Sequence, residues 1–325
     1  MLEIRDLEIA FPAPAGEVAV VRGAALEIGR GEIVGLVGES GSGKSLTALA
    51  VLGLVPAPGR IRAGSIRFEG RELVGLSERE LRPLRGGRIG LVFQEPSAAL
   101  NPVLTVGTQI VEAIRAHRDL PRRAARERAR ELLALLAVPD PDRRLDEYPH
   151  QLSGGQRQRA LVAIALAAGP DLLIADEPTT ALDVTVQAQV LELLVRLRRE
   201  LGLAILLITH DLAVVAETCD RAVVMYAGRP VEAAPVEALF AAPAHPYTRA
   251  LLASLPRLGE PVPRGALPSV PGQVPTPTQL PAGCPFHPRC AERLASCSIE
   301  DPPWLDLGGG RGARCVLAGT GRAAS

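Results

Sequence analysis

The stretch Gly38-Glu39-Ser40-Gly41-Ser42-Gly43-Lys44-Ser45 decides the fold of this chain. It has the spacing of a phosphate-binding loop, and it lies between an apolar run at 33–37 and a helical pattern at 46–54. Glycines let backbone N–H groups turn towards phosphate, and the helix start adds partial positive charge. We predict that Lys44 reaches the β- and γ-phosphates of a nucleotide and that the Ser45 hydroxyl binds Mg²⁺. The alternative is a chance glycine-rich turn.

Lysine usage supports this prediction. The 325 residues include 36 basic side chains, and Lys44 is the one lysine among them. A sequence that otherwise uses arginine keeps a lysine where a compact ammonium fits and a planar guanidinium does not.

Charge and hydropathy bound the class of protein. The 36 basic residues are balanced by 36 acidic ones, so net charge gives no reason to expect a nucleic acid or a membrane surface as partner. No apolar run approaches the roughly 18–20 residues that span a bilayer. The first six residues lack the features of a signal peptide, so we expect a cytoplasmic chain.

Apolar runs and helical patterns alternate along the chain, which predicts an α/β fold with a mainly parallel central sheet. The alternating pattern at 1–29 indicates antiparallel strands, and 221–232 indicates a hairpin. Buried strands are expected at 33–37, 89–93, 172–175 and 204–208. Helices are expected at 46–54, 104–137, 153–168 and 184–201.

Two acidic residues follow the apolar run 172–175. Such a strand delivers Asp176 and Glu177 to its carboxyl end, the usual ligand edge of a parallel sheet. Beside a phosphate-binding loop, Asp176 is expected to hold the Mg²⁺ shell and Glu177 to polarise a water for attack on the γ-phosphate. The alternative role for both is helix capping before Pro178.

The segment Leu152-Ser153-Gly154-Gly155-Gln156 begins another predicted helix. Ser153 and Gln156 fit a capping box, which is a purely structural role. The glycines Gly154 and Gly155 also allow an anion to approach the helix N-terminus closely. Two such helix starts and one phosphate-binding loop suggest that two copies share each nucleotide.

Together these motifs resemble the ATP-binding subunits of ABC transporters over roughly residues 1–245, and residues 152–156 match the family's signature motif. By the same resemblance, Gln94 matches the glutamine that contacts the metal, and Asp183, in Ala181-Leu182-Asp183, matches the D-loop. His210 matches the switch histidine at the γ-phosphate, and Phe11 matches the aromatic residue that stacks on adenine. A histidine after an apolar strand is otherwise more often structural.

The resemblance implies a domain with a mainly parallel core, an antiparallel β subdomain and a helical subdomain. It also implies a head-to-tail dimer in which ATP lies between the phosphate-binding loop of one domain and the signature motif of the other. The expected partners are a second ATPase subunit, two transmembrane permease subunits and, indirectly, an extracytoplasmic solute-binding protein. The chain is then peripheral, at the cytoplasmic face of the cell membrane.

Residues 246–325 differ in character and narrow the family. Residues 244–252, Ala-His-Pro-Tyr-Thr-Arg-Ala-Leu-Leu, resemble a segment of the oligopeptide/dipeptide/nickel importer ATPases. Within that family, the chain most resembles the dipeptide/oligopeptide "D" subunit. This resemblance implies ATP-driven import of peptides, with nickel or glutathione as the alternative solute. Ten prolines between Pro256 and Pro288 predict an extended arm or a loop-rich module held by something other than a core.

Four of the five cysteines lie in this extension, with the spacing Cys-x₅-Cys-x₆-Cys-x₁₇-Cys: Cys284, Cys290, Cys297 and Cys315. A disulfide is disfavoured in a reducing cytoplasm, and zinc favours closer pairs. We predict a [4Fe–4S] cluster, which some members of the resembled family carry here; zinc and no metal are the alternatives. His287 is a possible substitute ligand, and Cys219 is expected to be a small buried side chain.

The sequence also bears on other classes of protein. The arginine-rich pattern between Arg115 and Arg130 suits a solvated helix face, because a nucleic-acid surface would interleave aromatic residues. A non-transport ABC protein usually carries two ATPase units or a long coiled coil, and this chain shows neither. A P-loop kinase or GTPase is opposed by the signature motif.

Overall fold

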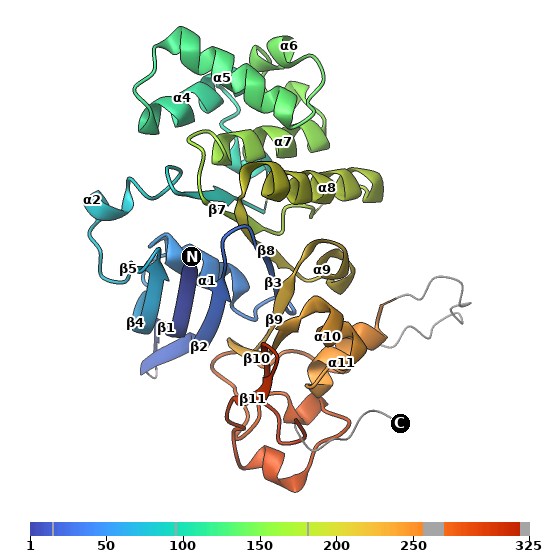
Figure 1. The fold of residues 1–325 in the computed structure, drawn as a ribbon. Coiled ribbons are helices and arrows are strands. Elements are labelled where there is room, and N and C mark those ends of the chain that lie inside the picture. The colour runs from blue at the N-terminus through green and yellow to red at the C-terminus, as the bar shows by residue number, and fades with distance from the viewer. Residues whose placement is uncertain (15, 95, 181, 256–269, 319–325) are drawn as a thin grey trace. The chain divides into compact units, whose positions relative to one another are not determined.

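The computed structural model describes residues 1–325 except 15, 95, 181, 256–269 and 319–325. The chain divides into two compact units, and most of their elements are labelled in Figure 1. The first unit comprises Met1–Glu27, Val34–Val74 and Thr209–Ser325, and the second comprises Ile28–Ile33 and Gly75–Ile208.

The first unit contains a four-stranded sheet in the order β2-β1-β4-β5. Its strands are β1 (Leu2–Ala13), β2 (Gly16–Ile28), β4 (Arg60–Phe68) and β5 (Arg71–Glu72). The antiparallel strands predicted at 1–29 are thus confirmed. A bulge after Arg5 interrupts the β1–β4 register, so the buried positions change phase between Ile4 and Leu7.

The same unit contributes strands in the order β11-β12-β10-β9-β3 to a larger sheet. These are β3 (Ile33–Val37), β9 (Arg221–Tyr226), β10 (Arg229–Pro235), β11 (Leu305–Gly308) and β12 (Arg311–Ala313). The β3–β9 pair is parallel, whereas β9–β10 is the predicted hairpin. Four helices accompany them: α1 (Lys44–Val51), α9 (Leu212–Thr218), α10 (Val236–Ala241) and α11 (Pro246–Ala253).

The expectation that the proline-rich extension lacks a core is wrong. Tyr247 of α11 and Phe286 are buried beside Tyr226 of β9, with ring centroids 4.7 and 5.2 Å from that of Tyr226. Edge-on aromatic packing of this kind stabilises beyond the apolar area that it buries. The extension also adds β11 and β12 to the sheet beside β10, and it includes two short 3₁₀ helices, His287–Arg289 and Ala295–Ser298.

The second unit has a parallel set of strands in the order β8-β7-β6, namely β8 (Ala204–Thr209), β7 (Leu172–Asp176) and β6 (Ile89–Val92). Its helices are α2 (Glu78–Leu81), α3 (Pro96–Ala99), α4 (Val106–His117), α5 (Arg122–Leu135), α6 (Pro141–Leu145), α7 (Gly154–Ala165) and α8 (Val184–Leu201), with a 3₁₀ turn at Pro149–Gln151. Figure 1 shows α4 and α5 lying side by side in green, with α7 packed against them. The α/β class is confirmed.

The helix expected over 104–137 is two helices, because the chain turns between α4 and α5. Arg118 has an extended backbone, with φ −130° and ψ 128°, and Pro121 precedes α5. Proline has no N–H to donate and disfavours a helical residue before it, so the helix cannot continue through this point.

Among the described residues, no helix is both long and apolar enough to cross a bilayer.

Candidate nucleotide-binding site

The phosphate-binding loop leaves β3 at Gly38 and enters α1 at Lys44. Gly43 precedes α1 with φ +94°, a left-handed conformation that favours glycine. A Cβ atom on Gly38 would lie 2.2 Å from the Met225 carbonyl oxygen, so only glycine fits there. Within the loop, Ser40 and Gly41 are exposed, Glu39 and Ser45 are partly buried, and Ser42 is buried.

Lys44 is 5% exposed, and its ammonium lies against the loop itself. Nζ donates to the carbonyl oxygens of Gly38 and Glu39, at 2.7 and 3.1 Å. Backbone carbonyls thus form a compact cation pocket, which explains why this position keeps the chain's one lysine.

Two further predicted residues belong to the first unit. Phe11 lies on β1, and its ring covers Gly59 so closely that a Cβ there would come within 2.5 Å of the ring. His210 is exposed and directly follows β8, where Asp211 caps α9 by accepting from the Ala213 N–H. Their predicted contacts with adenine and the γ-phosphate stay predictions.

In the second unit, β7 ends at Asp176 and the chain turns at Glu177. Glu177 has φ +46°, a rare conformation for a residue with a side chain, and its N–H donates to the Ile208 carbonyl. Such backbone strain concentrates at functional sites.

The Glu177 carboxylate has two described donors. Gln94 Nε2 donates to Oε2 at 3.0 Å, and Thr180 Oγ1 donates to the same oxygen at 2.9 Å. The structure thus brings together two of the predicted catalytic residues, Gln94 and Glu177. Thr180 was missed by sequence reasoning, although its spacing of three residues past Glu177 in a proline turn is a usable signal.

The segment 153–156 forms the start of α7. Ser153 Oγ accepts from the Gln156 N–H at 3.3 Å, and Gln156 Oε1 accepts from the Ser153 N–H at 3.0 Å, so the predicted capping box is confirmed. A Cβ on Gly155 would lie 2.7 Å from Val186 Cγ1 on α8, which makes glycine a packing requirement here. Gly154 lies beside Leu182, its would-be Cβ 3.6 Å from that side chain.

The predicted D-loop leads into α8. Asp183 is the N-cap of this helix, and its carboxylate accepts from the Val186 N–H at 2.9 Å. Ala181, which completes the motif, lies outside the described residues, as does Glu95 beside Gln94.

The four cysteines of the extension come from separate segments and line one small cavity of about 20 Å³. All four are free thiols. Burial, together with the neighbouring thiols Cys297 and Cys315, raises the pKa of Cys284 to about 11. Within the described part of the chain, no group of three or more His, Cys, Asp or Glu side chains is arranged to hold a metal ion.

Two other predicted side chains lie near that region. His287 lines the cysteine cavity, and its Nδ1 is 3.0 Å from the Cys284 carbonyl oxygen. Cys219 packs behind β3, where burial raises the pKa of its thiol to about 12. Cys219 is a small, partly buried side chain, whereas the sequence predicted a buried one.

Comparison with known proteins agrees with these motifs. Residues 21–180 match the family described as "ABC transporter", and residues 231–297 match "Oligopeptide/dipeptide transporter, C-terminal region". A protein of Brucella abortus (strain 2308), named "Putative peptide import ATP-binding protein", is 50% identical over 97% of this chain and 94% of its own length. The chain belongs to the ABC transporter ATP-binding family.

Further relatives extend this comparison. The oligopeptide transport ATP-binding protein AppD of Bacillus subtilis (strain 168) is 47% identical over 98% of this chain and 96% of its own length. Among solved structures, the dimeric post-hydrolysis state of the ATP-binding cassette MJ0796 with ADP and Pi is similar, with a TM-score of 0.65 and 28% identity over 73% of this chain and 99% of that one.

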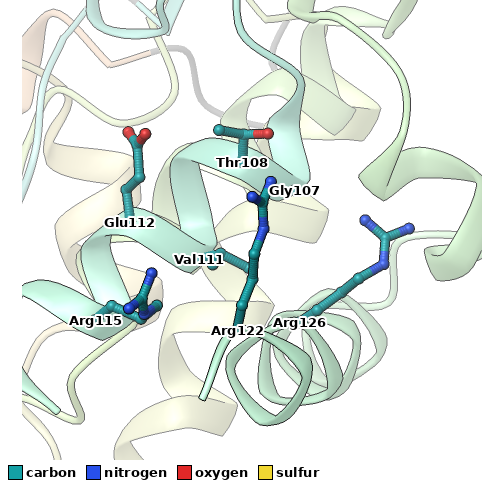
Figure 2. Close-up of a pocket in the computed structure, with 7 residues that line it drawn as sticks. All are labelled: Gly107, Thr108, Val111, Glu112, Arg115, Arg122 and Arg126. Atoms are coloured by element: carbon teal, nitrogen blue, oxygen red, sulfur yellow. The ribbon is translucent and has the colours of Figure 1, made fainter. Parts of the chain in front are cut away.

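The helical part of this ABC protein also holds an arginine-lined cavity of about 390 Å³, shown in Figure 2. Arg115 of α4 and Arg122 and Arg126 of α5 line it, together with Gly107, Thr108, Val111 and Glu112. Arg126 pairs with Asp146 at 2.8 Å. None of these lining residues is aromatic, whereas a surface that binds single-stranded nucleic acid would offer aromatic side chains for base stacking. The lining therefore fits the solvated helix face expected from the sequence.

Proposed function

We propose that this chain hydrolyses ATP to energise an ABC importer of dipeptides or oligopeptides. The observation that supports nucleotide binding is the buried Lys44 ammonium within the phosphate-binding loop. Peptide import and oligopeptide transport are the activities in the names of relatives that share 50% and 47% identity with this chain. Nickel and glutathione are the alternative solutes.

The residues have distinct proposed roles. The loop 38–45 cradles the phosphates, with Phe11 on the adenine and His210 at the γ-phosphate. Ser45, Asp176 and Gln94 would hold Mg²⁺, which offsets phosphate charge. Glu177, oriented by Gln94 and Thr180, accepts a proton from the attacking water. Ser153–Gln156 and Asp183 face the nucleotide of the partner subunit.

We propose a heterodimer with a second, homologous ATPase subunit, bound to two permease subunits at the cytoplasmic face of the cell membrane. A solute-binding protein acts on this complex only indirectly. Residues 1–245 are the proposed ATPase domain, and residues 246–325 are its C-terminal extension.

The cysteine cavity is the proposed site of a [4Fe–4S] cluster with a structural role. What supports this proposal is the donor chemistry: four free thiols line one cavity, although the described side chains are not arranged there to hold a metal. A cluster there would tie together segments of the extension between residues 284 and 315.

Reconstitution with the partner subunits tests the transport proposal. The complete complex in proteoliposomes, supplied with its solute-binding protein, should take up labelled peptide in an ATP-dependent manner. Uptake of nickel or glutathione and not of peptide would show that one of these is the transported solute. Co-purification with ribosomes and not with permeases would support a non-transport ABC protein.

A further inference from the structure

The C-terminal extension contacts the phosphate-binding loop within the first unit. Arg289 Nη1 donates to Glu39 Oε2 at 2.7 Å, and Arg289 Nη2 donates to Glu39 Oε1 at 3.0 Å. This is a bidentate ion pair between residues 250 positions apart in sequence. Bidentate pairing of a planar guanidinium with a carboxylate is geometrically specific.

Arg289 is held in place by contacts besides Glu39. Its side chain is 5% exposed, and it donates to the carbonyl oxygens of Pro271 and Val270, at 2.7 and 3.2 Å. It also donates to the Tyr226 hydroxyl at 3.3 Å. A buried arginine with this many fixed partners has little freedom to leave the Glu39 carboxylate.

Glu39 is held on its backbone as well. Its N–H donates to the Tyr247 hydroxyl at 3.0 Å, and its carbonyl accepts from Lys44 Nζ at 3.1 Å. The Ser42 N–H also donates to that carbonyl, at 3.2 Å. The second residue of the loop is therefore fixed on one side by the extension and on the other by the loop lysine.

A carboxylate is an unusual neighbour for a triphosphate. Glu39 carries negative charge in a loop whose other groups are arranged to attract anions, and like charges at short range repel, most strongly where water is excluded. Arg289 offsets that charge.

We infer that Arg289 is a positioning residue through which the C-terminal extension neutralises Glu39 and holds the phosphate-binding loop ready for ATP. Removal of the guanidinium would leave an uncompensated, partly buried carboxylate beside the phosphates and would release one anchor of the loop. The extension would then serve the ATP site of its own chain.

Equilibrium binding of a non-hydrolysable ATP analogue with Mg²⁺ to the full-length chain tests this inference. Arg289→Ala should weaken binding by roughly tenfold or more, as when one partner of a buried charge pair is removed. Higher ionic strength should narrow the deficit, because salt screens the repulsion. Arg289→Lys keeps the positive charge but cannot form the bidentate pair, so its affinity should lie between those of the parent and Arg289→Ala.

Charge rescue separates this inference from a merely structural role. In the Arg289→Ala background, Glu39→Gln should restore most of the lost affinity, because it removes the stranded carboxylate. A structural defect would not respond in this way. The matched control is Arg249→Ala, which breaks the ion pair of Arg249 with Glu292, at 2.8 Å, in the same extension and should keep the parent's affinity.

Each result has a stated meaning. Parental affinity in Arg289→Ala, an equal loss in Arg249→Ala, or no recovery in the double variant would overturn the inference. Because the inference rests on the proposed nucleotide binding, parent and Lys44→Ala are measured first. A parent that binds no nucleotide refutes the proposed function, whereas a parent that binds beside an unaffected Arg289→Ala refutes only the role of Arg289.

Discussion

The surroundings of Lys44 explain why this position holds a lysine. The Gly38 and Glu39 carbonyls approach its ammonium within 3.1 Å, inside a loop turned by glycines. A guanidinium is planar and wider, and its fixed fork suits flat anions more than a pocket of converging carbonyls. Position 44 therefore holds a lysine in a chain whose other 35 basic residues are arginines.

We therefore expect Lys44→Ala to abolish ATP hydrolysis and weaken nucleotide binding, because the phosphates lose the ammonium. Lys44→Arg should also fail, since the larger group cannot occupy the pocket. Steady-state ATPase assays on the assembled complex measure both. Near-normal turnover of Lys44→Arg would show that shape does not explain the lysine.

Glu177 is the proposed general base, and its side chain is already oriented. Glu177→Gln should retain ATP binding but lower turnover at least roughly 10²-fold, because no carboxylate remains to accept the proton. The variant should accumulate as an ATP-bound dimer with its partner ATPase, visible by size-exclusion chromatography. Parental hydrolysis would place the base elsewhere, with His210 the next candidate.

Thr180 tests how that orientation arises. Thr180→Val removes the hydroxyl that donates to Glu177 at 2.9 Å, and we expect kcat to fall about tenfold with little change in KM. Thr180→Ser keeps the hydroxyl and should stay near the parent. Equal losses in both variants would show that the methyl group matters and the hydrogen bond does not.

At the scale of elements, α7 and α8 meet at Gly155. An alanine there would place its Cβ 2.7 Å from Val186 Cγ1, and a β-branched residue on a helix has one strongly preferred rotamer and cannot easily turn away. Gly155→Ala should lower the free energy of unfolding by about 1–3 kcal/mol, the usual cost of overpacking. Chemical denaturation measures the change.

Val186→Ala provides the rescue for this pair. It removes the Cγ atoms that would clash, so the double variant should recover most of the stability lost in Gly155→Ala. Additive losses in the double variant would show that the two helices do not restrict residue 155.

Local patterns predicted the elements that are decided locally. The phosphate-binding loop, the buried strands, the capping box at Ser153 and the hairpin β9–β10 follow from short-range spacing, and the structure has them all. Pro121 is a sequence signal for the break between α4 and α5, which the prediction of one helix over 104–137 did not use. The strands β11 and β12 are short, and their place in the sheet depends on the pairing of β12 with β10 across a long sequence separation.

The core of the extension escaped prediction for the same reason. Tyr226 comes from the hairpin, whereas Tyr247 and Phe286 lie 21 and 60 residues further along, so no periodicity within one segment reveals their contact. The Arg289–Glu39 pair spans 250 positions and is likewise visible only in three dimensions. Sequence reasoning proposed the motif residues of the candidate site but not Thr180 or Arg289, which contact Glu177 and Glu39.

At the scale of the whole molecule, the segment around His245 is where the extension joins the sheet. Glu232 of β10 is buried and accepts from the N–H groups of Ala244 and His245, at 2.6 and 2.9 Å. Burial lowers the pKa of His245 to about 3, so this histidine is neutral at physiological pH and acts as the N-cap of α11. The extension is therefore attached through the same sheet that carries the phosphate-binding loop.

The last prediction concerns the cysteine cavity: anaerobically purified protein should be brown, with broad absorption near 400 nm and roughly four irons per chain. Replacing Cys284, Cys290, Cys297 or Cys315 by serine should bleach the protein. Cys219→Ala is the matched control and should keep the iron, because Cys219 packs behind β3 and does not line the cavity.

Proteolysis then distinguishes a structural cluster from the aromatic core alone. Tyr226, Tyr247 and Phe286 already anchor one part of the extension, so loss of the cluster should open the segments around Cys297 and Cys315 to protease while ATP binding persists. Colourless anaerobic protein with about one zinc per chain would reject iron–sulfur and keep a structural metal. Metal-free protein with a protease-resistant extension would reject both, since aromatic packing and the β10–β12 pairing would then suffice to order it.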